Sequence, residues 1–356
     1  MASVVFSVMR RRDDLPAMRW PMAVLFILFA AVSGAAAARL ASPAIPEEPL
    51  ASQNIAGIAA SLAFIPLAVM FYAQIILLWR KVASLLATPV MFGAMLLFGA
   101  RMSVACALSL ALLFMSYVFA VSLITKETRF RRMASLSVAA AVSLALCLAV
   151  RIGLDYGSFS GFAAAYMEAA PAAIARVYES LVARAGAVAI QPDPVVLRSM
   201  AREAIMLAPA GFGIICVAIA WTADRLIRRM FTLIGCPEVF TDEHAGVTMP
   251  FSYAAVYALI FIPALFTPAS VFPFLHAALV NALLILALPC AAVGIRGITD
   301  WLEERLFYMT RERALAAILL FVAFVTLRAY PFLLVTSAIG AYSVIRNYWK
   351  GKRSLS

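Results

Sequence analysis

The chain has 356 residues, of which 65% are hydrophobic and 13% are charged, about half the charged fraction of roughly 25% in soluble domains. So few charges cannot give a globule of this size a polar surface, which excludes a disordered chain, a disulfide scaffold and an ordinary soluble enzyme. The net charge of +11 would indicate nucleic-acid binding in a soluble protein, but here it indicates membrane topology, because basic residues collect in cytoplasmic loops.

The hydrophobic residues form long runs that predict an all-α, polytopic transmembrane helix bundle. A helix needs roughly 20 apolar residues to cross the bilayer, and nine runs reach or approach that length. All 18 Asp and Glu fall outside these runs, and Arg328 is the one basic residue inside them. We therefore expect about nine crossings, within a range of eight to ten. The runs are Trp20–Ala38, Asn54–Trp79, Val82–Gly99, Ser103–Thr125, Ala134–Val150, Ala204–Ala223, Met249–Phe266, Val271–Ile295 and Ala314–Ile345.

The order of the runs divides the chain into three parts. Residues 1–150 are expected to form an N-terminal bundle of five spans. Residues 151–203 form an extramembrane amphipathic helical segment that lies on the membrane or caps the bundle, and residues 204–356 form a C-terminal bundle with a broken last helix and a basic tail. Asp193 is a good N-cap and Pro194 a good first residue for the following helix. The apolar face of the amphipathic segment comprises Ile174, Val177, Tyr178, Leu181 and Val182.

Basic residues predict the orientation. With the N-terminus in the cytoplasm, the inside segments hold 17 Lys and Arg and the outside segments 11, as expected in a bacterial cytoplasmic membrane. The basic tail conflicts with this orientation unless Ala314–Ile345, about 48 Å long as one helix, folds back at Tyr330–Pro331. Trp20–Ala38 resembles a signal peptide, but we favour a retained span.

The chain lacks the motifs of catalytic and metal sites. It contains no HExxH, no P-loop and no GxGxxG between a strand and a helix. His244 has acidic neighbours but no second histidine nearby, so we interpret its segment as a solvated cytoplasmic loop without a metal. We expect no enzymatic activity, no catalytic residues, no metal and no cofactor.

Three polar residues in or near apolar runs are the candidate ligand-binding residues: Asn281, His276 and Arg328. We favour an interhelical hydrogen bond over ligand binding for Asn281, because Asn commonly joins helices in membrane bundles. His276 is expected near the interface. Arg328 is expected at the turn of the broken last helix, where its head reaches headgroup water.

The order of features in the C-terminal half resembles the YybS-like family of uncharacterised bacterial membrane proteins. The features that carry the resemblance are Leu207-Ala208-Pro209-Ala210, the basic residues Arg225, Arg228 and Arg229, then Met249-Pro250-Phe251, Asn281 with Gly294, and a final segment from Gly340 to Arg346. That family is grouped with the substrate-binding subunits of energy-coupling-factor vitamin transporters, which are six-helix bundles. The resemblance implies a similar N-terminal bundle and carries over no binding residues.

These observations favour a transporter-like or small-ligand-binding membrane component. Its expected partners are the lipid bilayer and other membrane subunits, and we expect no nucleic acid. The alternative is a structural or assembly protein that binds other proteins through its extramembrane helix and basic loops. Kinks predicted at prolines inside the spans, together with the absence of catalytic motifs, favour the first role.

Overall fold

The structure is a computed structural model that describes residues 20–41, 55–78, 83–184, 193–233, 249–268, 270–305 and 329–353. Over these ranges the chain is helical and contains no strand, which confirms the predicted all-α class. The helices are α2 (Trp20–Ala41), α3 (Ile55–Leu78), α4 (Ala83–Leu97), α5 (Met102–Ile124), α6 (Arg129–Tyr156), α7 (Phe159–Arg184), α8 (Pro194–Leu233), α9 (Phe251–Phe266), α10 (Pro273–Arg305) and α12 (Ala329–Arg353).

Five of these helices are long and apolar enough to cross a membrane, so the predicted nine crossings are not confirmed. The structure places helices at all nine predicted runs, but α4 and α9 have only 15 and 16 residues, or about 23 and 24 Å at 1.5 Å per residue. Both are shorter than a hydrocarbon core of about 30 Å. The five candidate spans are Pro21–Ala38, Met102–Ile124, Arg129–Tyr156, Pro194–Leu233 and Pro273–Asp300.

The outer faces of the helices carry large apolar side chains. In water, these outer faces would expose far more hydrophobic surface than soluble monomers usually do. In a membrane, the lipid chains would cover the same surface. This distribution agrees with a membrane protein. Exposed examples on α6 and α9 are Val138, Leu146, Leu154, Leu259, Ile262 and Phe266.

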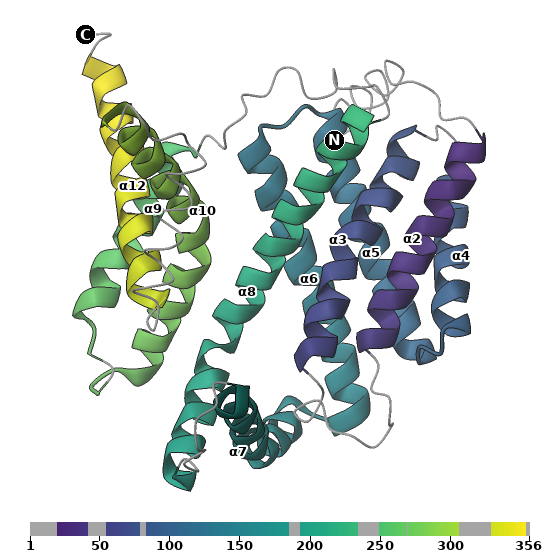
Figure 1. Cartoon of the computed structure of the whole chain (residues 1–356), viewed down its shortest axis with the longest axis horizontal. Helices are drawn as coiled ribbons and strands as arrows, with labels where there is room; N and C mark the ends of the chain where they lie inside the picture. The colour runs from purple at the N-terminus through teal and green to yellow at the C-terminus, as the bar shows by residue number, and fades with distance from the viewer. Residues whose placement is uncertain are drawn as a thin grey trace. The chain divides into compact units, whose positions relative to one another are not determined.

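The chain divides into two compact units (Figure 1). The first unit comprises Met1–Met206 and Ile215–Glu243, and the second comprises Leu207–Ile214 and His244–Ser356. The middle of α8 therefore belongs to the second unit, while its two ends belong to the first.

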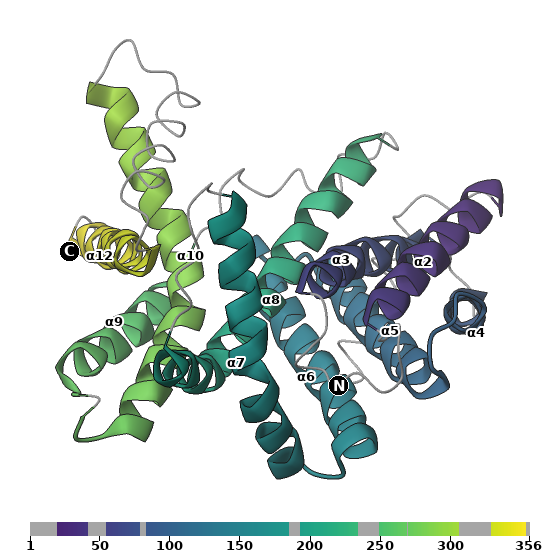
Figure 2. The ribbon, with the colours of Figure 1, turned by 60° about the horizontal axis from the view of Figure 1, so that its bottom comes forward.

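The first unit is built around α2, α3 and α5. Helix α2 packs against α3 and α4, α3 also packs against α5, and α5 packs against α6 (Figure 2). Phe71 of α3 contacts the rings of Phe26 and Phe29 of α2, with centroids 5.9 and 5.1 Å apart. Ala35 and Ala37, in the run that resembles a cleavage site, are buried. This packing makes α2 part of the folded bundle, and its retention stays a prediction.

In the second unit, α10 and α12 approach each other unusually closely through glycines. A Cβ added at Gly294 would lie 1.9 Å from the carbonyl oxygen of Thr336, and one at Gly340 would lie 1.9 Å from the carbonyl oxygen of Cys290. Any other residue would overlap backbone at these two positions. The glycines therefore allow the contact between the two helices, which also pack against α9.

Helix boundaries differ from those expected from hydropathy. Asp193 caps α8 as predicted, its Oδ1 accepting a hydrogen bond from the backbone N–H of Val195 at 2.8 Å. The helix then continues ten residues past Ala223, where the apolar run ends, to Leu233. Hydropathy marks only the apolar part of a helix, whereas backbone hydrogen bonding continues through the polar turns that follow.

The predicted amphipathic segment, residues 151–203, and the predicted broken last helix, residues 314–345, are described only in part. Helix α7 is continuous over 26 residues and is joined to α6 by Gly157, whose φ of +69° favours glycine. Helix α12 begins at Ala329, so Pro331 falls in its first turn, where the missing N–H costs no helical hydrogen bond. Residues 314–328 lie outside the described residues, and the fold-back of the last run stays a prediction.

Candidate functional site

The strongest concentration of buried charge in the described chain joins the start of α6 to the distal part of α8, within the first unit. Thr128 is the N-cap of α6, and its hydroxyl accepts a hydrogen bond from the backbone N–H of Arg131. Arg129 and Arg132 are three residues apart, so they share one face of the first turn. On α8, Asp224 and Arg228 are four residues apart and share a face for the same reason.

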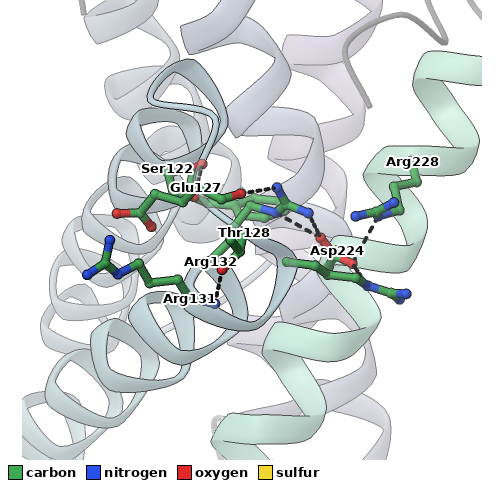
Figure 3. A network of polar contacts seen from close by, with 9 residues as sticks. Ser122, Glu127, Thr128, Arg131, Arg132, Asp224 and Arg228 are labelled. Atoms are coloured by element: carbon green, nitrogen blue, oxygen red, sulfur yellow. Dashed lines mark hydrogen bonds and ion pairs between the residues drawn. The ribbon is translucent and has the colours of Figure 1, made fainter. Parts of the chain in front are cut away.

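Asp224 is the centre of this cluster (Figure 3). Its Oδ1 accepts hydrogen bonds from Nε and a terminal nitrogen of Arg132, at 2.9 and 2.7 Å. Its Oδ2 accepts from Nε of Arg129 at 2.9 Å and from Nε of Arg228 at 3.2 Å. The carboxylate is fully buried, and the Arg132 side chain is 1% exposed. Charge-assisted bonds of this kind are the stronger class of hydrogen bond, so the cluster ties α6 to α8. We call these four residues the Asp224 cluster.

The other carboxylate near the cluster is oriented differently. Arg132 donates a hydrogen bond to the backbone carbonyl of Glu127 at 3.4 Å, while the Glu127 side chain points away from Asp224 (Figure 3). The Oε2 atom of Glu127 is buried and has no hydrogen-bond partner. Asp224 is therefore the carboxylate that balances the positive charge of Arg129, Arg132 and Arg228.

The Asp224 cluster was missed by the sequence interpretation, which assigned all four residues to polar cytoplasmic segments outside the spans. The structure adds that Asp224 and Arg132 both lie in helices and are buried. A signal was present: both segments are rich in arginine and were expected on the same membrane face. A local hydropathy pattern cannot, however, show that residues 92 and 95 positions apart make contact.

A second unusual polar group lies in the core of the first unit. Gln74 of α3 is fully buried, and neither its Oε1 nor its Nε2 has a hydrogen-bond partner. Met70 and Phe71, which precede it by four and three residues on the same helix face, are apolar. Leaving one buried polar group unpaired costs about 1–3 kcal/mol. The amide is therefore a destabilising feature of the bundle as it stands.

Asn281 makes the predicted interhelical hydrogen bond. Its Oδ1 accepts from the backbone N–H of Ala210 of α8 at 2.8 Å, and its Nδ2 donates to the carbonyl of Ala277 at 2.8 Å. Ala210 directly follows Pro209, which interrupts the regular hydrogen bonding of α8. Both the oxygen and the nitrogen of the amide thus have a hydrogen-bond partner, and the bond to Ala210 joins α8 to α10 within the second unit.

Of the other two candidate ligand-binding residues, the structure describes only His276. His276 lies in the first turn of α10, and its Nδ1 is 2.8 Å from the carbonyl oxygen of Thr267. Arg328 and His244 lie outside the described residues. Across the described part of the chain, no group of three or more His, Cys, Asp or Glu side chains could hold a metal ion.

Comparison with known proteins gives no relative for this chain: no family model, no curated protein and no solved structure matches it.

Proposed function

We propose that the protein is an integral membrane protein of the bacterial cytoplasmic membrane that binds a small polar ligand within its N-terminal bundle, as a transporter-like component and not as an enzyme. The candidate spans support the membrane part of this proposal. The similarity in feature order to the YybS-like family, and through it to vitamin-binding transporter subunits, agrees with the ligand-binding part.

The observation that carries the proposal is the Gln74 amide. A fully buried amide with neither atom paired lowers stability, and sequences retain such groups mainly where function requires them. The amide can donate and accept at the same time, so it suits a polar ligand that offers both an acceptor and a donor. Binding of that ligand would replace the missing hydrogen bonds.

The test replaces Gln74 with methionine, which has similar volume but no hydrogen-bonding amide. In the ligand-free protein we expect Gln74→Met to keep or raise the melting temperature, because no hydrogen bond is lost. Native mass spectrometry of protein purified in mild detergent should detect a small-molecule adduct on the wild type and none on Gln74→Met.

The matched control is Ser116→Ala, which removes another buried polar group of the same unit. Ser116 has a partner, since its hydroxyl donates to the carbonyl of Val69 at 3.3 Å, so this variant should lose stability slightly and keep the adduct. A wild type without any adduct, together with a destabilised Gln74→Met protein, would show that Gln74 serves folding alone.

The orientation is a separate part of the proposal. In a cysteine-free background, a cysteine at Ser356 should resist labelling from outside intact cells, because a fold-back of the last run would return the tail to the cytoplasm. A cysteine at Asp193, in the segment expected outside, should be labelled. Labelling of the tail from outside would refute the fold-back.

An assembly role is the second candidate, and α7 is the observation that favours it. This helix has 26 residues and is not among the five candidate spans, so it is available to contact another membrane subunit. Crosslinking followed by purification distinguishes the two roles. A stable set of partner proteins that persists after small ligands are removed would favour assembly.

A further inference from the structure

The C-terminal end of α12 lies at the same end of the second unit as the start of α9. The ring of Phe251, the first residue of α9, stacks on the ring of Tyr348 of α12, with centroids 4.2 Å apart. Further along α9, the hydroxyls of Tyr257 and Ser337 are hydrogen-bonded to each other. Residue numbers therefore rise along α9 where they fall along α12. The two helices are antiparallel, and the last turns of α12 lie beside the first turn of α9.

One face of α12 is exposed over about four turns and changes in character toward the end of the helix. Its residues follow one another at intervals of four, three, four and three, which keeps them on one side of the helix. The first two are aliphatic, and Val335 is 57% exposed. Tyr342 and Trp349 are 64% and 52% exposed, and Arg346 between them is also exposed. We call this surface the Arg346 face. It comprises Val335, Ile339, Tyr342, Arg346 and Trp349.

The order of side chains along the Arg346 face matches the layers of a lipid monolayer. Aliphatic side chains suit acyl chains, Tyr and Trp concentrate where hydrocarbon meets headgroups, and a guanidinium group matches phosphate in charge and geometry. Arg346 is four residues from Tyr342 and three from Trp349, so both aromatic residues are its neighbours on the helix surface. The local charge also suits an anionic partner, because residues 346–353 contain four basic residues and no acidic one.

We propose that the Arg346 face binds an anionic phospholipid. Arg346 pairs with the phosphate, the two aromatic side chains pack beside the headgroup, and the acyl chains lie along the aliphatic part of the face. Since the segment before α9 is expected in the cytoplasm, the lipid belongs to the cytoplasmic leaflet, where anionic lipids attract basic segments. This inference rests on the membrane part of the proposed function and is independent of a ligand at Gln74.

The test measures lipid binding by the full-length protein purified in mild detergent. Native mass spectrometry gives apparent dissociation constants for phosphatidylglycerol, which is anionic, and for phosphatidylcholine, which carries phosphate but has no net charge. The test variant Arg346→Asn/Asn347→Arg exchanges two exposed neighbours. It keeps the composition and net charge but moves the guanidinium group about 100° around the helix. The matched control is Arg198→Gln, which removes an exposed arginine of α8 in the first unit.

We expect the wild type and the control to prefer phosphatidylglycerol. The exchange variant should bind this lipid about fivefold more weakly at an unchanged melting temperature, because only exposed side chains differ. The preference should also weaken as salt rises. An exchange variant that keeps the wild-type preference would overturn the proposal, because net charge alone would then explain the binding. Equal binding of the two lipids by the wild type would overturn it as well.

Two further outcomes would assign the Arg346 face to another occupant and overturn the lipid assignment. If inorganic phosphate raises the melting temperature as much as phosphatidylglycerol does, the ligand is free phosphate. If Tyr342→Cys in a cysteine-free background crosslinks two copies of the chain in phosphatidylglycerol nanodiscs, the face is a contact between copies. A protein that stays folded in water without detergent would refute the membrane part of the proposed function too, whereas equal lipid binding by a detergent-dependent protein refutes this inference alone.

Discussion

Replacing Asp224 with asparagine should destabilise the protein severely. The change keeps the size of the side chain but removes the negative charge that accepts four hydrogen bonds at 2.7–3.2 Å from three arginines. Because the carboxylate is fully buried, water cannot replace it. Removing one partner of a buried ionic cluster costs roughly 3–5 kcal/mol, which is at least a hundredfold in the folding equilibrium.

The assay is urea or thermal unfolding of the detergent-purified protein, followed by tryptophan fluorescence. The matched control is Asp155→Asn, where the carboxylate pairs with Arg101 at 3.2 Å and Arg151 at 3.4 Å but is 29% exposed. Such a surface pair contributes about 0–1 kcal/mol. If Asp224→Asn loses no more stability than Asp155→Asn, the cluster does not hold α6 and α8 together. As a further check, adding Arg132→Met to Asp224→Asn should cost less than the two single changes predict, because these neighbours are coupled.

Two further changes test the second unit. Gly294→Ala should lower the free energy of unfolding by about 3 kcal/mol or more, because its Cβ would overlap the backbone of Thr336. Gly297→Ala on the same helix meets nothing within 4 Å and should stabilise by up to about 1 kcal/mol; equal effects of the two changes in an unfolding titration would contradict the close approach. Asn281→Ala should cost about 1–2 kcal/mol through the lost bond to Ala210 and should leave any ligand adduct seen by native mass spectrometry intact. Loss of that adduct at unchanged stability would instead return Asn281 to the ligand-binding candidates.

Local sequence features predicted those parts of the fold that depend on neighbours along the chain. The helical membrane class follows from the apolar runs, and the start of α8 follows from Asp193 and Pro194. The interhelical role of Asn281 also followed from local reasoning, because Asn inside an apolar run commonly joins helices in membrane bundles. The sequence did not show that this partner is the backbone N–H of Ala210, which belongs to a helix 71 positions away.

The amino-acid sequence by itself determined that the described chain is helical and apolar enough for a membrane, because hydropathy and backbone hydrogen bonding act over one or two turns. Only the tertiary structure decided which polar groups meet. The contacts of Asp224 with Arg129 and Arg132, the approach of Gly294 to Thr336 and the unpaired amide of Gln74 all depend on how distant helices pack. The free energy of a buried charge, a shared backbone surface or an unpaired amide is set by what surrounds it in space, and hydropathy along the chain does not contain that information.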